Sequence, residues 1–343
     1  MKINSVLSIL FLFIHLFIYS QEITGVVLDK KDNNPIANAA VYFDNTTKGV
    51  ITNSKGFFSI EYQAGITTPL VVSYLGYKNI VLEKYEANKH YKVLLEEDES
   101  ILNEVVLVSK NNWPREKKLT YFKTQFLGKT KNGKSCKILN EDDIKLWYNK
   151  KENKLTARAN KPIVIENKNL GYKIQYNLQD FEIDFIAYKI KKNEFSKAYK
   201  NKYVIKSVSY SGTSLYKNLE TSLDKKIIKK RHKTYNGSVL HFMRSIANNK
   251  LFAEDFKLFK GSFQINPPDY LLVEKQASIT KVELTERLEI LHKNEQSFFI
   301  PNSNHFIIDV LGNYSPVNSI LFGGEMSKKR IGDTLPLDFT PKK

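Results

Sequence analysis

The chain has 343 residues, 42% of them hydrophobic and 26% charged, with a formal net charge of +17. This length favours about two domains, and the hydrophobic content is that of a globular protein rather than a disordered one. Because Cys136 is the only cysteine, the chain has no internal disulfide, which excludes a disulfide-stapled scaffold. We expect Cys136 to be a small apolar core residue.

Residues 1–20 have the pattern of a secretory signal peptide. Lys2 precedes an apolar run over residues 6–18, and Ser20 is the small residue before the predicted cleavage site. The apolar run is short for a membrane span, which needs about 20 residues. We therefore expect an exported protein, periplasmic or associated with the outer membrane, with no transmembrane span after cleavage. The alternative is an N-terminal anchor that is retained.

Charge is divided unevenly along the chain. Residues 22–108 carry 8 Lys and Arg against 12 Asp and Glu, whereas residues 109–343 carry 44 against 24. This asymmetry predicts a domain boundary near residues 100–112. A basic exported domain can attract acidic polysaccharide, lipopolysaccharide or a phospholipid surface. Nucleic acid is not an expected partner because the protein leaves the cytoplasm. The alternative is that the lysines are simply solvated.

Residues 22–96 alternate short β-prone runs with Gly- and Asn-containing turns, a spacing typical of a β-sandwich. The predicted strands are 23–27, 39–43, 50–52, 57–60, 69–74, 77–82 and 91–95. Pro35 and Gly56 are expected to set turns between them.

The turn and strand residues of this region resemble the carboxypeptidase regulatory-like domain, a transthyretin-like sandwich. The similarity lies in Gly25-Val26-Val27, in Pro35 followed by Ala39, in the run 49–58 and in Gly76-Tyr77. This domain occurs in uncharacterised bacteroidete envelope proteins and at the N-terminus of TonB-dependent receptors. Asn53 stands where the family usually has Asp, and Asn can make the same side-chain turn to the backbone. Whether Asn53 alters a cation site present in some members stays open.

Residues 97–112 form the predicted linker. Residues 96–110 resemble the joint that leads into the plug of TonB-dependent receptors. A plug and barrel would need several hundred more residues, so we expect the joint to lead into a different domain.

Residues 113–343 are predicted to form a basic α+β domain of unknown function with mostly antiparallel strands. Pro114 begins a helix with Leu119, Phe122 and Phe126 on one face, and Gly128 ends it. Ser238 is expected to cap a second helix. The predicted strands are 143–148, 155–159, 162–166, 172–178, 181–187, 203–212, 270–274, 287–291, 298–300 and 306–310.

The resemblance raises the question of a zinc carboxypeptidase, which needs a His-x-x-Glu pair and a distant His. His292 and Glu295 have the spacing of the pair, but the only later histidine, His305, follows too closely. We interpret residues 292–295 as a solvated hairpin turn. No catalytic residue, cofactor or metal site is predicted, and the protein is not expected to be an enzyme.

The leading hypothesis is a non-catalytic binding or docking module of the cell envelope, an accessory to outer-membrane nutrient uptake. The expected partner is an envelope protein or an acidic glycan. The alternative is a glycan- or peptide-acting hydrolase with an unrecognised site in residues 113–343. The candidate partner contacts are the basic residues Lys225, Lys226, Lys229, Lys230 and Arg231 and the aromatic residues Trp113, Trp147 and Tyr148.

Overall fold

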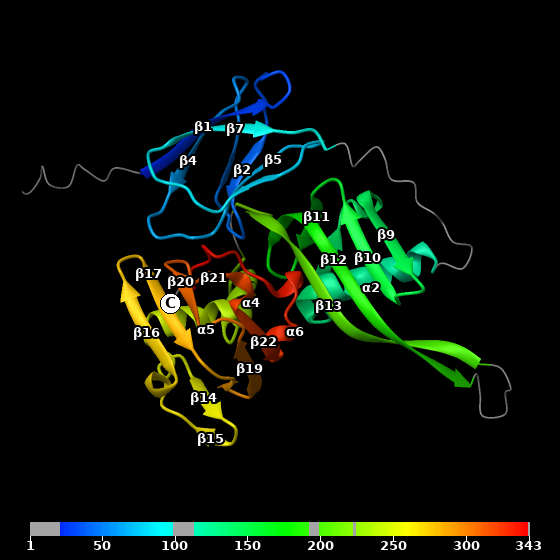
Figure 1. Cartoon of the computed structure of the whole chain (residues 1–343), viewed down its shortest axis with the longest axis vertical. Coiled ribbons are helices and arrows are strands. Elements are labelled where there is room, and N and C mark those ends of the chain that lie inside the picture. The colour runs from blue at the N-terminus through cyan, green and yellow to red at the C-terminus, as the bar shows by residue number, and fades with distance from the viewer. Residues whose placement is uncertain (1–20, 99–112, 192–198, 222–223, 342–343) are drawn as a thin grey trace, which may run out of the picture.

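The computed structural model describes residues 21–98, 113–191, 199–221 and 224–341, with backbone only at 190, 191 and 199–201 (Figure 1). The predicted signal peptide, residues 1–20, lies outside the described residues, as does most of the predicted linker. No helix in the described ranges is long and apolar enough to cross a membrane. The architecture is mostly β, with predominantly antiparallel sheets and few helices.

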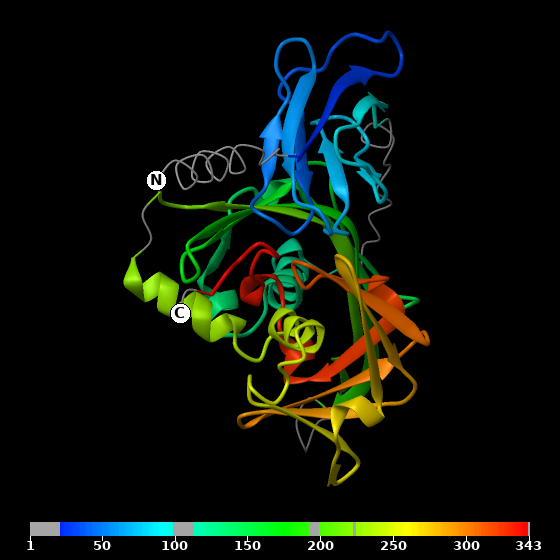
Figure 2. The same cartoon turned by 90° about the vertical axis from the view of Figure 1, so that its left-hand side faces the viewer.

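The N-terminal domain is a sandwich of two sheets, seen at the top of Figure 2. One sheet has the order β4-β1-β7 and the other β3-β2-β5-β6. All pairs are antiparallel except β1 with β7. The strands are β1 Gln21–Asp29, β2 Ala40–Phe43, β3 Gly49–Ile51, β4 Phe57–Tyr62, β5 Leu70–Ser73, β6 Ile80–Leu82 and β7 His90–Leu95. The predicted β-sandwich is confirmed.

Buried and partly exposed residues alternate along β1, and the buried ones pack the two sheets against each other. Ile23, Gly25 and Val27 face inward, and Phe58 of β4 fills the space beside them. A Cβ on Gly25 would lie 2.4 Å from the carbonyl oxygen of Tyr91 and 2.7 Å from the Phe58 ring. Only glycine therefore allows this close approach.

Asn53 makes the turn that leads into β4. Its Oδ1 accepts hydrogen bonds from the backbone N–H of Lys55 at 2.9 Å and of Phe57 at 3.0 Å. We expect Asn53→Ala to lower the free energy of unfolding by about 1–2 kcal/mol, because two backbone donors lose their acceptor. The matched control is Asn53→Asp, which keeps an acceptor oxygen and should cost less than half as much in urea titrations. Equal costs for the two variants would contradict this role.

The second region, residues 113–218, packs helices on a six-stranded sheet. The sheet order is β8-β11-β12-β10-β9, and β13 pairs with β12 along nearly its whole length. The helices are α2 Arg115–Leu127 and α3 Lys131–Ser135, with the 3₁₀ turn η2 Glu141–Asp143. The strands are β8 Cys136–Ile138, β9 Ile144–Asn149, β10 Lys154–Ala159, β11 Ile163–Asn167, β12 Tyr172–Lys191 and β13 Tyr199–Asn218.

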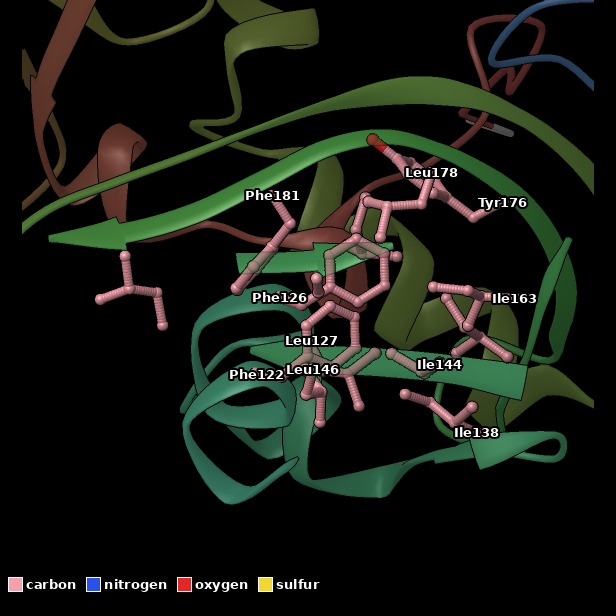
Figure 3. Packing of buried hydrophobic residues seen from close by; sticks show 14 of the residues in the cluster. Phe122, Phe126, Leu127, Ile138, Ile144, Leu146, Ile163, Tyr176, Leu178 and Phe181 are labelled. Atoms are coloured by element: carbon pink, nitrogen blue, oxygen red, sulfur yellow. The ribbon is translucent and has the colours of Figure 1, made fainter. Parts of the chain in front are cut away.

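The core of this region lies between α2 and the concave side of the sheet (Figure 3). Phe122 and Phe126 are fully buried, with ring centroids 5.0 Å apart. Phe126 also meets the rings of Tyr176 and Tyr210 edge-on. The predicted helix and the glycine that ends it are confirmed, because Gly128 is the C-cap with φ +99°.

The third region contains the remaining strands, in two sheets, and a second core built on α5. The sheet orders are β15-β14-β18-β19-β22 and β16-β17-β20-β21. The helices are α4 Lys225–Tyr235, α5 Val239–Ala247 and α6 Glu325–Lys328, with 3₁₀ turns η3 Pro267–Asp269, η4 Val317–Ser319 and η5 Ile331–Asp333. The strands are β14 Phe256–Lys260, β15 Phe263–Gln264, β16 Leu271–Gln276, β17 Ile279–Leu284, β18 Leu288–His292, β19 Glu295–Pro301, β20 His305–Asp309, β21 Tyr314–Ser315 and β22 Ile320–Gly324.

Two sequence predictions for residues 113–343 differ from the structure. The strands predicted at 172–178 and 181–187 are one strand, β12, which continues through an irregularity in pairing between Leu178 and Asp180. The basic run 225–233, for which no helix was predicted, is helical and belongs to α4. Ser238 caps α5 as predicted, accepting a hydrogen bond from the His241 N–H.

Candidate functional site

A buried polar junction joins the N-terminal sandwich to the second region. The Tyr42 side chain is 2% exposed, and its hydroxyl lies 2.9 Å from Thr213 Oγ1 and accepts from Asn177 Nδ2 at 2.6 Å. Beside it, Asp44 Oδ1 accepts from the backbone N–H of Ser214 at 2.7 Å. Burial raises the pKa of the Asp44 carboxyl to about 6, which the backbone hydrogen bonds oppose.

Backbone pairing reinforces this junction. The Asn45 N–H donates to the Ser214 carbonyl at 2.8 Å, and the Tyr216 N–H donates to the Thr46 carbonyl at 2.9 Å. Thr46 thus forms a parallel bridge with Leu215 on the edge of β13. The loop after β2 is therefore fixed in position on the second region.

A second contact joins the sandwich to the third region. Asp309 Oδ2 accepts from the Thr67 N–H at 2.8 Å and from the Thr67 hydroxyl at 3.2 Å. Its Oδ1 accepts from the N–H groups of Leu311 and Asn313, both at 2.9 Å. Burial raises the pKa of Asp309 as well.

The C-terminal segment, residues 334–340, runs between these regions and beside α4 (Figure 2). Arg244 of α5 holds it by donating to the carbonyls of Leu337 at 2.6 Å and Phe339 at 2.9 Å. The Leu337 N–H in turn donates to the Asn45 carbonyl at 2.6 Å. These hydrogen bonds hold residues 334–340 in place, where they form one wall of a cleft beside α4.

This cleft, which we call the α4 cleft, has a volume of about 500 Å³ and draws its lining from all three regions. Its lining residues are Thr47, Tyr172, Asn218, Thr221, Ile228, Arg231, His232, Pro336, Asp338, Phe339 and Thr340. The sandwich contributes Thr47, whose N–H and hydroxyl both donate to the Asp338 carboxylate. Thr47 thus orients the one carboxylate in this lining, and as a neutral donor it leaves the negative charge of Asp338 in place.

Arg231 supplies a positive charge that no carboxylate neutralises within the described residues. Its side chain is 4% exposed, and its guanidinium donates to the carbonyls of Leu170 at 2.7 Å and Gly171 at 3.1 Å and to Asn218 Oδ1 at 2.9 Å. The guanidinium also lies 3.6 Å from the centre of the Tyr172 ring. Desolvation lowers the pKa of Arg231. In the described structure, Arg231 is therefore a buried cation with neutral acceptors only, an arrangement that can attract an anion.

The amphipathic sequence of α4 explains why Arg231 is buried while its neighbours are not. Arg231 and Tyr235 lie on the inner face of the helix. The other basic candidates, Lys225, Lys226, Lys229 and Lys230, are exposed, and Lys230 Nζ donates to Asn169 Oδ1 at 2.8 Å. The predicted basic run is therefore divided into an exposed lysine face and one arginine that lines the cleft.

The structure corrects the expectation for two of the predicted aromatic contacts. Trp113 and Tyr148 are 9% and 6% exposed and stack on each other with centroids 3.9 Å apart. Lys117 Nζ lies 3.7 Å from the Trp113 ring and covers it further. Both rings are core residues of the second region, because apolar aromatic area is stabilised by burial. Trp147 is half-buried on the opposite face of β9.

Residues 292–295 form the predicted hairpin turn, but His292 is not solvated as expected. It is 6% exposed, and its ring lies 4.6 Å from Phe256 and 5.6 Å from His241. Desolvation lowers the pKa of both histidines. In the part of the chain that the structure describes, no group of three or more His, Cys, Asp or Glu residues could hold a metal ion.

Burial raises the pKa of the Cys136 thiol to about 12.

A cleft of similar size, about 520 Å³, lies over β14, β18 and β19. Its charged residues, Arg287 and Glu289, pair with each other at 3.0 Å. The α4 cleft also holds one cation and one carboxylate, but Arg231 and Asp338 form no ion pair in the described structure, so Arg231 is the freer of the two cations to attract a charged ligand.

Sequence reasoning missed the residues that build the α4 cleft, apart from Arg231. Thr47, Asn218 and residues 336–340 come from three distant segments and carry no local motif. The one available signal was the amphipathic spacing of Ile227, Ile228, Arg231 and Tyr235 within the basic run.

The folded N-terminal domain and its turn residues define a carboxypeptidase regulatory-like sandwich. Residues 23–107 match the family described as CarboxypepD_reg-like domain, which confirms the resemblance seen in the sequence. The match extends beyond residue 96, the predicted end of this domain. Among curated proteins, no match to the chain was found.

Solved structures similar to this chain include a type II cohesin–X-dockerin complex from Acetivibrio cellulolyticus, at 23% identity and a TM-score of 0.19. That match covers 22% of this chain and 56% of the other chain. A Bacteroides uniformis protein provisionally described as carbohydrate binding matches at 9% identity over 89% of this chain and 99% of its own, with a TM-score of 0.19. A Bacteroides fragilis protein of unknown function, provisionally described as membrane-associated, matches at 10% identity over 88% and 94%, with a TM-score of 0.17.

Proposed function

We propose that the protein is an exported, non-catalytic binding protein of the cell envelope whose α4 cleft binds an acidic glycan. The observation that carries the proposal is Arg231, a buried guanidinium with only neutral acceptors that lines a cleft of about 500 Å³. The pattern of residues 1–20 and the regulatory-like domain support the envelope location.

The chemistry of the cleft fits a carboxylated or sulfated sugar. Arg231 donates to protein acceptors through Nε and Nη2, which leaves Nη1 to donate to a ligand carboxylate or sulfate, and such charge-assisted hydrogen bonds are the strong ones. Phe339 and His232 lie in the lining with rings 6.2 Å apart, so an apolar sugar face can pack beside the anionic group. The exposed lysines of α4 would raise the local concentration of a polyanion.

The proposed biological role is accessory to nutrient uptake across the outer membrane. Its support is the resemblance of residues 96–110 to the joint that precedes the plug of TonB-dependent receptors. A binding protein with such a joint would deliver or retain an acidic glycan beside a transporter.

Isothermal titration calorimetry with the mature chain, residues 21–343, tests the cleft. Tetragalacturonate should bind at least roughly tenfold more tightly than its methyl-esterified form, because esterification removes the charge-assisted bonds. Arg231→Gln should abolish that preference, while Lys150→Gln, on an exposed hairpin away from the cleft, should leave it unchanged. The double variant Lys225→Gln/Lys229→Gln changes only exposed residues and should weaken binding without loss of fold.

Three results would contradict the proposal. The first is equal affinity for the acidic and esterified sugars, and the second is binding of neither. The third is shortening of the oligosaccharide during the titration, which would favour the hydrolase alternative.

A further inference from the structure

The hairpin of β12 and β13 extends beyond the rest of its sheet. β10 pairs with β12 only as far as Asp184, and the Phe185 N–H donates to the Asn153 carbonyl at 2.8 Å, so residues 186–191 pair with β13 alone. Figure 1 shows this two-stranded arm, in green, projecting from the body of the molecule. We call the described side chains of residues 185–189 and 202–206 the β-arm.

The two faces of the β-arm have different surroundings. On the inner face, Phe185 and Tyr203 meet the Trp113 ring edge-on at 5.2 and 4.8 Å. The register places Ile186 opposite Val204 and Tyr188 opposite Lys202, so these four residues share the outer face. The outer face has no such cover in the described structure.

The outer face combines exposed apolar side chains with lysines. Ile186, Tyr188 and Val204 are 41%, 48% and 42% exposed. Lys202 shares the outer face with Val204 and is exposed, and Lys206, which has no residue opposite it at the register shift between Asp184 and Phe185, is exposed as well. Neither lysine forms an ion pair with a described residue. This face therefore exposes aliphatic and aromatic side chains next to lysines that have no ion-pair partner among the described residues, a combination that water alone does not favour.

The described acidic residue that adjoins the β-arm in sequence is already engaged. Asp184, at the base of the arm, accepts from the Ser207 hydroxyl at 2.7 Å and lies 3.9 Å from Lys154 Nζ. The β-arm therefore presents net positive charge.

We propose that the outer face of the β-arm docks on an anionic lipid bilayer surface. Lysines near an anionic surface gain attraction, and a tyrosine ring is suited to the boundary between headgroups and acyl chains. Ile186 and Val204 decide between a bilayer and a soluble polyanion, because aliphatic side chains gain from burial among acyl chains and gain nothing from a hydrated polymer. This surface is separate from the α4 cleft and does not depend on it.

Co-sedimentation of the mature chain with vesicles tests the proposal. Vesicles of phosphatidylglycerol and phosphatidylcholine in equal parts should retain the protein, and vesicles of phosphatidylcholine alone should not. Lys202→Gln/Lys206→Gln should weaken the binding roughly 30-fold. Ile186→Ser/Val204→Ser should weaken it roughly tenfold. The matched control is Lys55→Gln/Lys84→Gln, which removes the same charge from exposed loops of the N-terminal sandwich and should have less than a twofold effect.

Circular dichroism on each variant separates loss of binding from loss of fold. Unchanged vesicle binding by the two arm variants would overturn the proposal, as would loss of binding in Lys225→Gln/Lys226→Gln on α4 instead. A third outcome would also overturn the proposal. In it, Lys202→Gln/Lys206→Gln loses vesicle binding, Ile186→Ser/Val204→Ser keeps it, and dextran sulfate displaces the protein from the vesicles. The β-arm would then bind a soluble polyanion. Failure here leaves the glycan titration unaffected.

Discussion

Truncating Phe126 to alanine is expected to lower the free energy of unfolding of the second region by about 3–5 kcal/mol. Phe126 is 0% exposed and contacts the rings of Phe122, Tyr176 and Tyr210, which come from α2, β12 and β13. Removing the ring leaves a cavity between helix and sheet that neither element can close, because each is held by its own hydrogen bonds.

Tryptophan fluorescence during urea unfolding measures this effect selectively. The two tryptophans of the chain, Trp113 and Trp147, both lie in the second region. The matched control is Phe252→Ala, whose side chain is 81% exposed, and it should change stability by less than about 0.5 kcal/mol. A loss below about 1 kcal/mol for Phe126→Ala would mean that the core shown in Figure 3 is wrong.

The buried carboxyl of Asp44 predicts that the junction is more stable in acid. Burial raises its folded-state pKa to about 6 from the ordinary value of 3.8. Between these values the folded state binds more protons than the unfolded state, so this contribution is fully present below pH 3.8 and is lost as pH rises through about 6. The difference corresponds to about 3 kcal/mol between these limits. The raised pKa of Asp309 acts in the same direction.

His241 and His292 act in the opposite direction. Their pKa values are lowered, so the unfolded state takes up protons first as pH falls below 6.5, and stability decreases. The measurement is therefore the difference between wild type and Asp44→Asn in urea titrations at a series of pH values, which cancels the histidines. Wild type should gain on the variant by about 3 kcal/mol from pH 7 to below pH 4. A difference that is independent of pH would show that Asp44 is not buried at the junction.

How far the sequence predicts this fold depends on how local each signal is. Gly25, Asn53 and Gly56 act within one turn or strand, so the sandwich could be identified from residue order. The helix after Pro114 was likewise found from its apolar spacing and Gly128. The region 177–180 contains polar residues that resemble a turn, but continuous pairing with β13 keeps it in one strand.

The candidate site was less predictable because its contacts are distant in sequence. Asp44 and Ser214 are separated by 170 positions, and Thr47 and Asp338 by 291. The helix α4 was missed because six of its eleven residues are Lys or Arg, a composition that suggests a solvated run. Only the folded chain shows that Arg231 faces inward.

Hydrogen exchange measured by mass spectrometry on the mature chain, with and without tetragalacturonate, tests the central claim most directly. If the α4 cleft binds an acidic glycan, peptides containing residues 218–221, 228–232 and 336–340 should exchange more slowly with the sugar present. The methyl-esterified sugar should give no such protection, and the β-arm should be unchanged by either. Two results would contradict the account. One is slower exchange only in other segments, and the other is unchanged exchange everywhere at a tetragalacturonate concentration that saturates binding in the calorimetric titration.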